Sequence, residues 1–136
     1  MREDTQMQEH PNAATVRRAF DAFVQGDLDA LGAAFTDDVV WHVPGMNRFA
    51  GRFDGRDAVI ARLARMHEAG IEQRLEVHDV VANDEHAVAL VALHVTNAEG
   101  RRYDQQQVQV WHMRDGRCHE YWAMNQDQAV LDLLLA

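Results

Sequence analysis

The sequence predicts an α+β fold in which helices precede a long, strongly curved and mainly antiparallel sheet. Helical spacing of apolar residues dominates the first half, and from residue 72 onward short turn motifs separate strand-like stretches. Strands joined by tight turns pair antiparallel, so this order excludes a doubly wound parallel sheet. With 136 residues, 47% of them hydrophobic, we expect a single domain over 12–136 with a core and a cavity. Residues 1–11 are polar and are expected to be frayed.

Three helices are expected ahead of the long sheet. Asn12 is expected to cap the first, which ends at Gly26, and Asp27 caps a short second helix. Asp57 lies in the first turn of the third helix, which ends at Gly70. The supporting apolar positions are Val16, Phe20, Phe23 and Val24 in the first helix, Leu28, Leu31 and Phe35 in the second, and Val59, Ile60, Leu63 and Met66 in the third.

The strand pattern begins before the third helix and then continues almost to the C-terminus. A first strand is expected at 39–43, stopped by Pro44 and Gly45, and a closing helix at 127–135. Hairpin-type sequences connect the four long strands, which are expected at 72–82, 86–96, 102–113 and 117–125.

The composition excludes several classes of function. A formal net charge of −9, without any cluster of basic residues, disfavours binding to nucleic acid or to anionic membranes. The chain contains no Lys and no Ser, which removes Schiff-base chemistry, serine nucleophiles and Lys-dependent phosphate loops. The eight His form no i, i+4 pair on a helix, so no metal site and no cofactor are expected. Acid–base or electrostatic chemistry remains.

Cys118 is the one thiol of the chain. It follows the turn at Asp115-Gly116 without an obvious activating partner, so we interpret it as a packed strand residue rather than a nucleophile. A single Cys allows no internal disulfide, and the polar start of the chain shows no signal peptide. Together these features predict a cytoplasmic protein.

The long strands are apolar on both faces. Residues 87–95 are all apolar except His94, and Val108 and Val110 alternate with Gln107 and Gln109. A sheet with two apolar faces needs a cover on each. The helices cover one face, and we expect a second copy of the chain to cover the convex face in a homodimer.

Four stretches of the sequence carry a resemblance to a known superfamily. Over about residues 12–127 the chain resembles nuclear-transport-factor-2-like proteins, especially the SnoaL-like (polyketide cyclase) and ketosteroid-isomerase-like branches. The resemblance implies a cone-shaped pocket between the helices and the concave face of the sheet, often in a dimer. The stretches are Gly26–Leu31, Phe35–Trp41, Gly51–Val59 and Asp115–Trp122.

The residues that carry chemistry in these relatives are replaced here. Aligned on this resemblance, the isomerase's tyrosine donor corresponds to Ala19, its general-base aspartate to Val43, and its protonated acid to the vicinity of Gln109. Ala and Val cannot move a proton, so isomerase chemistry through those groups is excluded. The acid that commonly follows the strand tryptophan in the cyclase branch is replaced by Ala123.

The face that each strand turns toward the pocket depends on the turn at Arg114–Gly116. We expect a three-residue turn, which pairs Gln109 with Tyr121 and Trp111 with His119. A two-residue turn would shift the register by one and exchange the faces of the last strand. In the expected register, Leu90, Ala92 and His94 also point inward, and His42 points outward.

This register predicts an aromatic, thioether-rich pocket with a few polar groups. His94 is the candidate acid or base, and Tyr121 and Gln109 are candidates for polarising a carbonyl. The expected substrate-binding residues are Phe20, Phe23, Trp41, Val43, Met46, Phe49, Met66, Gln107, Trp111, Ala123 and Asn125.

Two functions are compatible with such a pocket. The first is a cofactor-independent cyclase, isomerase, dehydratase or hydrolase that acts on an apolar, oxygenated metabolite such as a polyketide or terpenoid. The second is a non-catalytic ligand-binding or dimeric interaction protein that retained the cone and lost the acids. The polar cluster favours the first hypothesis, and the replaced carboxylates favour the second.

Overall fold

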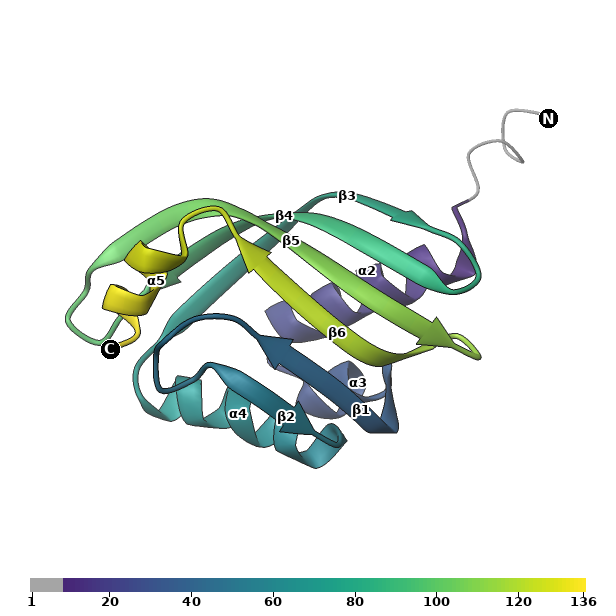
Figure 1. The fold of residues 1–136 in the computed structure, drawn as a ribbon, viewed down its shortest axis with the longest axis horizontal. Coiled ribbons are helices and arrows are strands. Elements are labelled where there is room, and N and C mark those ends of the chain that lie inside the picture. The colour runs from purple at the N-terminus through teal and green to yellow at the C-terminus, as the bar shows by residue number, and fades with distance from the viewer. Residues whose placement is uncertain (1–8) are drawn as a thin grey trace.

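The computed structural model describes residues 9–136, in which six strands form one curled sheet and four helices lie against it (Figure 1). This is the expected α+β cone. The helices are α2 (Pro11–Val24), α3 (Leu28–Gly32), α4 (Arg56–Glu68) and α5 (Gln128–Leu134). The strands are β1 (Phe35–Val43), β2 (Gly51–Asp54), β3 (Glu72–Ala82), β4 (His86–Thr96), β5 (Arg102–Arg114) and β6 (Arg117–Asn125).

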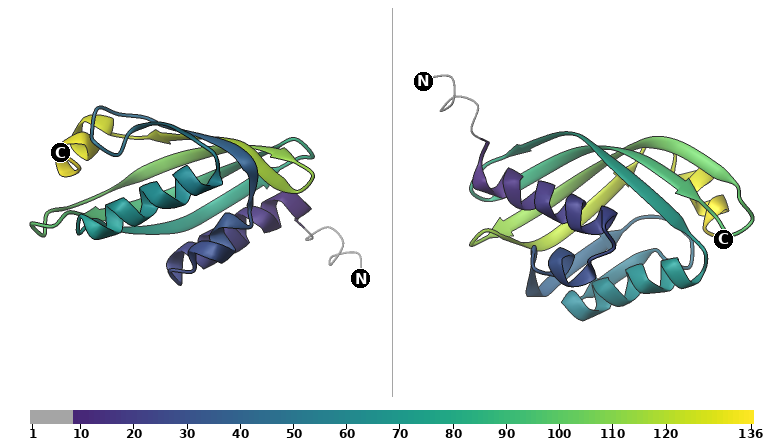
Figure 2. Two further views of the ribbon diagram at one scale, coloured as in Figure 1. Left: turned by 90° about the horizontal axis from the view of Figure 1, so that it is seen from below. Right: turned by 180° about the vertical axis from the view of Figure 1, so that it is seen from behind.

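The sheet has the order β2-β1-β6-β5-β4-β3. Strands β3 to β6 form an antiparallel meander, whereas β1 pairs parallel with β6 and antiparallel with the short edge strand β2. Helices α2, α3 and α4 lie on the concave side, and α5 lies near one end of the sheet (Figure 2). The concave side is therefore enclosed, and the convex side carries no helix of the described chain.

The first helix begins differently from the expectation. The predicted cap, Asn12, lies inside the helix, which starts at Pro11, and the Nδ1 atom of His10 accepts the Asn12 backbone N–H at 3.0 Å. Pro is favoured at this first position because its missing N–H is not needed there. The buried Asn12 side chain instead donates to the carbonyls of Asn83 and Asp84, at 2.9 and 3.1 Å. It thus joins α2 to the β3–β4 turn. Residues 1–8 of the segment expected to be frayed lie outside the described chain.

The turn between β5 and β6 has two residues, so the predicted three-residue turn is wrong. Arg114 pairs with Arg117, and Asp115 and Gly116 adopt left-handed φ values of 54° and 80°. Two such residues match the right-handed twist of the flanking strands. By itself this turn would exchange the faces of β6.

A bulge restores the face that the two-residue turn would have exchanged. The pairing shifts between His112 and Met113, so that Met113 pairs with Cys118 but Trp111 pairs with Tyr121. The extra residue opposite this shift is His119. Trp111, Tyr121 and the other expected residues of β5 and β6 therefore share the concave face, although the expected pairs are wrong by two residues.

Aromatic side chains pack together in the core between the helices and the sheet. Phe35 lies between two tryptophan rings, with ring centroids 5.4 Å from Trp41 and 5.3 Å from Trp111. Cys118 is fully buried in the same core, and its thiol donates to the Glu120 carbonyl at 3.2 Å. Burial raises the pKa of Cys118 to about 12, so it is a packed thiol and not a nucleophile. Among the helices of residues 9–136, none has the length and apolar character needed to cross a bilayer.

Candidate binding and active site

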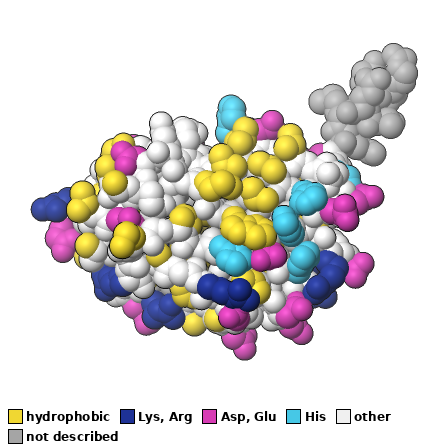
Figure 3. Space-filling model, in the orientation of Figure 1, with side chains coloured by type: hydrophobic (Ala, Val, Ile, Leu, Met, Phe, Trp, Pro, Cys, Tyr) yellow, Lys and Arg dark blue, Asp and Glu magenta, His cyan; other side chains and the backbone are white. Residues whose placement is uncertain are grey.

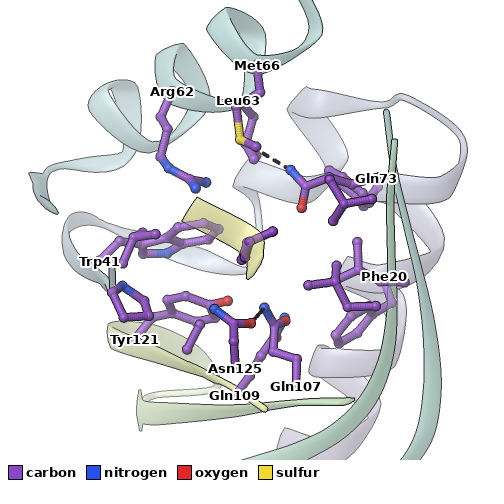
Figure 4. Close-up of a pocket in the computed structure, with 18 of the residues that line it drawn as sticks. Phe20, Trp41, Arg62, Leu63, Met66, Gln73, Gln107, Gln109, Tyr121 and Asn125 are labelled. Carbon is purple, nitrogen blue, oxygen red and sulfur yellow. Dashed lines mark hydrogen bonds between the residues drawn. The ribbon is translucent and has the colours of Figure 1, made fainter. Parts of the chain in front are cut away.

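A cavity opens between the concave face of the sheet and helices α2 and α4, and Leu131 and Leu135 of the C-terminal segment lie at its end. Counted with its open mouth, it holds about 860 Å³ of empty space. The wall is mainly aliphatic and aromatic, as is typical of small-molecule sites. Figure 4 shows side chains from α2, α4 and the strands pointing into this space. Eleven of the fourteen expected residues line it: Phe20, Phe23, Trp41, Val43, Met66, Gln107, Gln109, Trp111, Tyr121, Ala123 and Asn125.

His94 does not face the cavity, so the predicted orientation is wrong. It lies on the convex face, where Nε2 is 2.7 Å from Glu76 and Nδ1 is 2.8 Å from Asp104. Val91, Leu93 and Val95 are the buried residues of β4, whereas Leu90 and Ala92 face outward with His94. Thr96 pairs with Arg102 where β4 connects to β5. In this register the residues of β4 that were expected to point inward point outward, and their neighbours point inward.

Met46 and Phe49 also lie outside the cavity. Met46 is 93% exposed, whereas Phe49 is 4% exposed and packs in a separate part of the core with Ile71 and Leu93. Both residues belong to the irregular segment between β1 and β2, where neither strand nor helix periodicity assigns a direction to a side chain.

A chain of amide side chains forms one wall of the cavity. Trp111 Nε1 donates to Gln109 Oε1 at 3.1 Å, and Gln109 Nε2 donates to Gln107 Oε1 at 2.8 Å. Gln107 Nε2 in turn donates to Asn125 Oδ1 at 2.8 Å. Each amide keeps one N–H and one acceptor position free for a ligand.

The amide chain continues to a carboxylate in α5. Asn125 Nδ2 donates to Gln128 Oε1 at 2.8 Å, and Gln128 Nε2 donates to Asp132 Oδ1 at 2.9 Å. The same oxygen accepts from the Asn47 amide at 2.8 Å and from the Met46 backbone N–H at 3.1 Å. All donors along the chain therefore point toward Asp132, and hydrogen bonds aligned in this way polarise one another. These hydrogen bonds therefore fix the orientation of the amide side chains on the cavity wall.

Arg62 is a site residue that the sequence reasoning missed. It projects from α4 toward the cavity (Figure 4) and is only 7% exposed. Its Nε donates to the Phe49 carbonyl at 2.8 Å, and its guanidinium carbon lies 5.6 Å from the centre of the Phe53 ring. Burial lowers the pKa of Arg62 to about 10, so the group remains charged at neutral pH. The sequence did contain an indication of this position, because Arg62 lies on the same side of α4 as the buried residues Val59 and Met66.

Tyr121 faces the same cavity with a hydroxyl that makes no hydrogen bond to any described residue. Its ring stacks on Trp41, with centroids 4.2 Å apart and planes 23° apart. Burial raises the pKa of Tyr121, and the nearby Arg62 charge acts in the opposite direction. Tyr121 is therefore a neutral hydrogen-bond donor. The indole N–H of Trp41 also lacks a partner among residues 9–136.

The lining contains hydrogen-bond donors but no group suited to accept a proton. Within the described chain, no Asp, Glu, His or Cys side chain lines the cavity. Arg62, Tyr121 and the amides offer N–H and O–H groups to an oxygen atom of a ligand. Such a set stabilises negative charge on oxygen. No group of three or more His, Cys, Asp or Glu between residues 9 and 136 is arranged to hold a metal ion.

A curled sheet that closes with three helices around an internal pocket defines the nuclear-transport-factor-2-like class of proteins. Residues 16–121 match the SnoaL-like domain, and the chain belongs to this family. It is 36% identical over 104 residues to the uncharacterised protein Rv0034 of Mycobacterium tuberculosis, covering 75% of this chain and 79% of that one.

Solved structures share the fold over almost the whole chain. An NTF2-like protein of unknown function from Burkholderia pseudomallei is 31% identical, with a TM-score of 0.85 over 93% of this chain and 98% of that one. TerC, co-crystallised with polyporic acid, is 20% identical, with a TM-score of 0.84 over 93% of this chain and 98% of that one.

Proposed function

We propose that the protein is a cofactor-independent enzyme that binds an apolar, oxygenated metabolite in the cone and promotes a cyclisation, isomerisation or dehydration. The observation that carries this proposal is that the unpartnered Tyr121 hydroxyl and the buried Arg62 guanidinium line the same cavity, whose wall is mainly aromatic and aliphatic. The substrate class is polyketide- or terpenoid-like, because the wall offers aromatic and aliphatic surface with few polar contacts. The co-crystallisation of TerC, which shares this fold, with polyporic acid supports a small-molecule ligand.

The reaction step that suits this site is the formation of an enolate. When a carbon beside a carbonyl loses its proton, the negative charge develops on the carbonyl oxygen. Tyr121 would donate to that oxygen, the positive charge of Arg62 in the same cavity would favour the developing negative charge, and a donor that is already in place lowers the barrier. The proton would move to a basic oxygen of the substrate or to water, because no described lining residue accepts it. The enolate carbon can then attack a second carbonyl, or take up a proton at another position.

The experiment incubates the protein with enolisable aryl polyketones and cyclic enones and measures products by mass spectrometry. We expect Tyr121→Phe to lower kcat by about 100-fold, which is typical for the loss of one oxyanion donor. His94→Ala is the matched control, because His94 lies on the convex face. Turnover that is unchanged in Tyr121→Phe would remove the proposed role of the hydroxyl.

A second function, non-catalytic binding, is favoured by the absence of a proton-accepting group among the described lining residues. It predicts saturable binding with the ligand recovered intact. Product formation above the rate in buffer would exclude it. The same incubations therefore separate the two functions.

We also propose a homodimer formed through the convex face, in the cytoplasm and within a secondary metabolic pathway. Six apolar side chains with partial or full exposure form a contiguous group on that face, which we call the convex patch: Val88, Leu90, Val108, Val110, Trp122 and Met124. Figure 3 shows hydrophobic side chains gathered there beside histidines. A second copy that presents the same patch is the simplest apolar cover.

A further inference from the structure

Arg62 differs from the other arginines of residues 9–136 because it is the one that is buried. Six exposed or partly exposed arginines form ion pairs with carboxylates, whereas no carboxylate oxygen of the described chain lies within 4.0 Å of Arg62. The six pairs are Arg17–Glu9, Arg52–Asp54, Arg56–Asp37, Arg74–Glu76, Arg102–Asp104 and Arg114–Asp38.

A buried cation without an anion is unfavourable, because it has lost water and gained no opposite charge. The Phe49 carbonyl and the Phe53 ring compensate for part of this loss. The terminal nitrogens of Arg62 donate to no acceptor of the described chain. The cavity is the space from which an acceptor can reach them (Figure 4).

The geometry points to a ligand that carries a single delocalised oxyanion, which Arg62 binds, on an apolar body. A carboxylate and an enolised 1,3-dicarbonyl share this chemistry. The inference rests on the proposed function and narrows its substrate class to molecules that are anionic before any reaction. The apolar wall accommodates the body, and Gln107, Gln109 and Asn125 are placed to bind a further carbonyl or hydroxyl.

The surroundings of Arg62 favour a monoanion over phosphate or sulfate. One guanidinium lines the cavity within the described residues, and the chain contains no Lys to add a second charge. The net charge of −9 also repels ligands with several negative charges. A carboxylate or enolate, in contrast, matches the planar pair of donors on one arginine.

The first test compares ligands of similar shape and different charge by isothermal titration calorimetry. The probes are 2-naphthoate, its neutral analogue 2-acetonaphthone, and benzoylacetone titrated at pH values below and above its ionisation. We expect 2-naphthoate to bind about 10- to 100-fold more tightly than 2-acetonaphthone, as is usual for a hydrogen-bonded charged group. Benzoylacetone should bind more tightly once it is ionised. The two acidic probes show whether a carboxylate, an enolate or both are accepted.

The variants Arg62→Met and Arg65→Met assign the effect to one side chain. Both remove a cation from α4, but Arg65 is exposed and does not line the cavity. We expect Arg62→Met to abolish the preference for the anion and Arg65→Met to retain it. Arg62→Met should also melt at a higher temperature than the unliganded wild type, since an apolar side chain of similar length removes the buried charge. Arg62→Gln is the second variant if Arg62→Met does not fold.

The outcomes separate this inference from the proposed function. If 2-acetonaphthone binds the wild type as tightly as 2-naphthoate, the inference is wrong and the pocket function stands. If none of the probes binds, both are contradicted. Turnover that depends on Tyr121 but shows no change of KM in Arg62→Met would also contradict the inference while supporting catalysis.

Discussion

The two faces of one sheet carry different chemistry. In β5, Gln107, Gln109 and Trp111 point into the cone, whereas Val108, Val110 and His112 alternate with them on the convex side. The concave face has amides, a phenol and one guanidinium, but no titratable acid or imidazole among its described lining residues. The convex face has imidazoles and carboxylates around an apolar patch. The strand alternation thus places the amides and the phenol inside and the imidazoles and carboxylates outside.

Several histidines of the convex face lie around Trp122. The His42 ring stacks on Trp122 with centroids 4.8 Å apart, and its Nε2 lies 2.7 Å from Glu120. The His112 ring lies 4.6 Å from Trp122 and 4.8 Å from His86. Among these imidazoles, burial lowers the pKa of His112. No Asp, Glu, His or Cys of residues 9–136 lines the cavity on the concave side, so the contrast can be tested directly.

The largest expected effect concerns packing inside the cone. Phe35→Ala should lower the free energy of unfolding by about 3–5 kcal/mol, because it removes a buried ring from between Trp41 and Trp111. Urea denaturation measures this change. Val81→Ala is the matched substitution on the exposed side of β3 and should cost about 0.5 kcal/mol. Equal losses would contradict the assignment of one packed and one open face.

A charge in the convex patch should separate the proposed dimer. Leu90→Glu introduces a carboxylate into the patch, and in a twofold arrangement the new charge is present in both copies. We expect the wild type to be a dimer and the dimer dissociation constant of the variant to be at least about 10-fold higher. Size-exclusion chromatography with light scattering gives the masses. A monomeric wild type would mean that no second copy covers this face.

Mild acid should destabilise the protein through the convex face. Burial, together with the neighbouring His86, lowers the pKa of His112, although Glu120 acts in the opposite direction and His119 adds to the lowering. The unfolded chain then binds the proton more readily, so stability is present at neutral pH and is lost as the pH falls below about 6.5. We expect a lower melting temperature at pH 5.5 than at pH 7.5.

The variant His112→Phe keeps an aromatic ring against Trp122 and removes the titrating group. The difference in melting temperature between the two pH values should therefore be smaller than in the wild type. His78→Gln, on the exposed surface of β3, serves as the control. The carboxylates Asp38, Asp104 and Asp132 have lowered pKa values, so their contribution to stability is lost only at more acidic pH.

The smallest effect is expected at His94. His94→Ala should leave ligand binding in the cone unchanged, because the ring contacts Glu76 and Asp104 on the outside of the sheet. Calorimetric titration with 2-naphthoate measures this directly. A change of more than about threefold, which corresponds to roughly 0.7 kcal/mol, would indicate that the two faces communicate.

The sequence predicted the elements well because their signals are local. Helical spacing and the glycines that follow located α2, α3 and α4, and turn motifs located β3 to β6 within one or two residues. The face of β4 could not be obtained in this way. Apolar residues lie on both sides of β4, so His94 was the one local indication of which side faces outward, and the pairing of Thr96 with Arg102 decides.

The candidate site was predicted in part and for mixed reasons. Gln109 and Tyr121 face the cavity as expected, but through a two-residue turn and a bulge rather than a three-residue turn. Arg62 escaped attention because a charged residue on a helix is normally solvated. The burial of Arg62 and its access to a ligand depend on the Phe49 carbonyl and on the cavity. Only the tertiary structure brings these two features to α4.

The Asp132 carboxylate at the end of the amide chain connects parts of the molecule that are far apart in the sequence. One oxygen holds together the C-terminal helix, the loop after β1 and the wall of the pocket. Gly45 lies against this junction at φ 115°, and any Cβ there would overlap Gln128 and Asp132. A side chain at position 45 would therefore displace the ends of these two side chains and disturb the hydrogen bonds that join the helix to the loop. The position of α5 and the alignment of the amides on the cavity wall therefore depend on the same carboxylate oxygen.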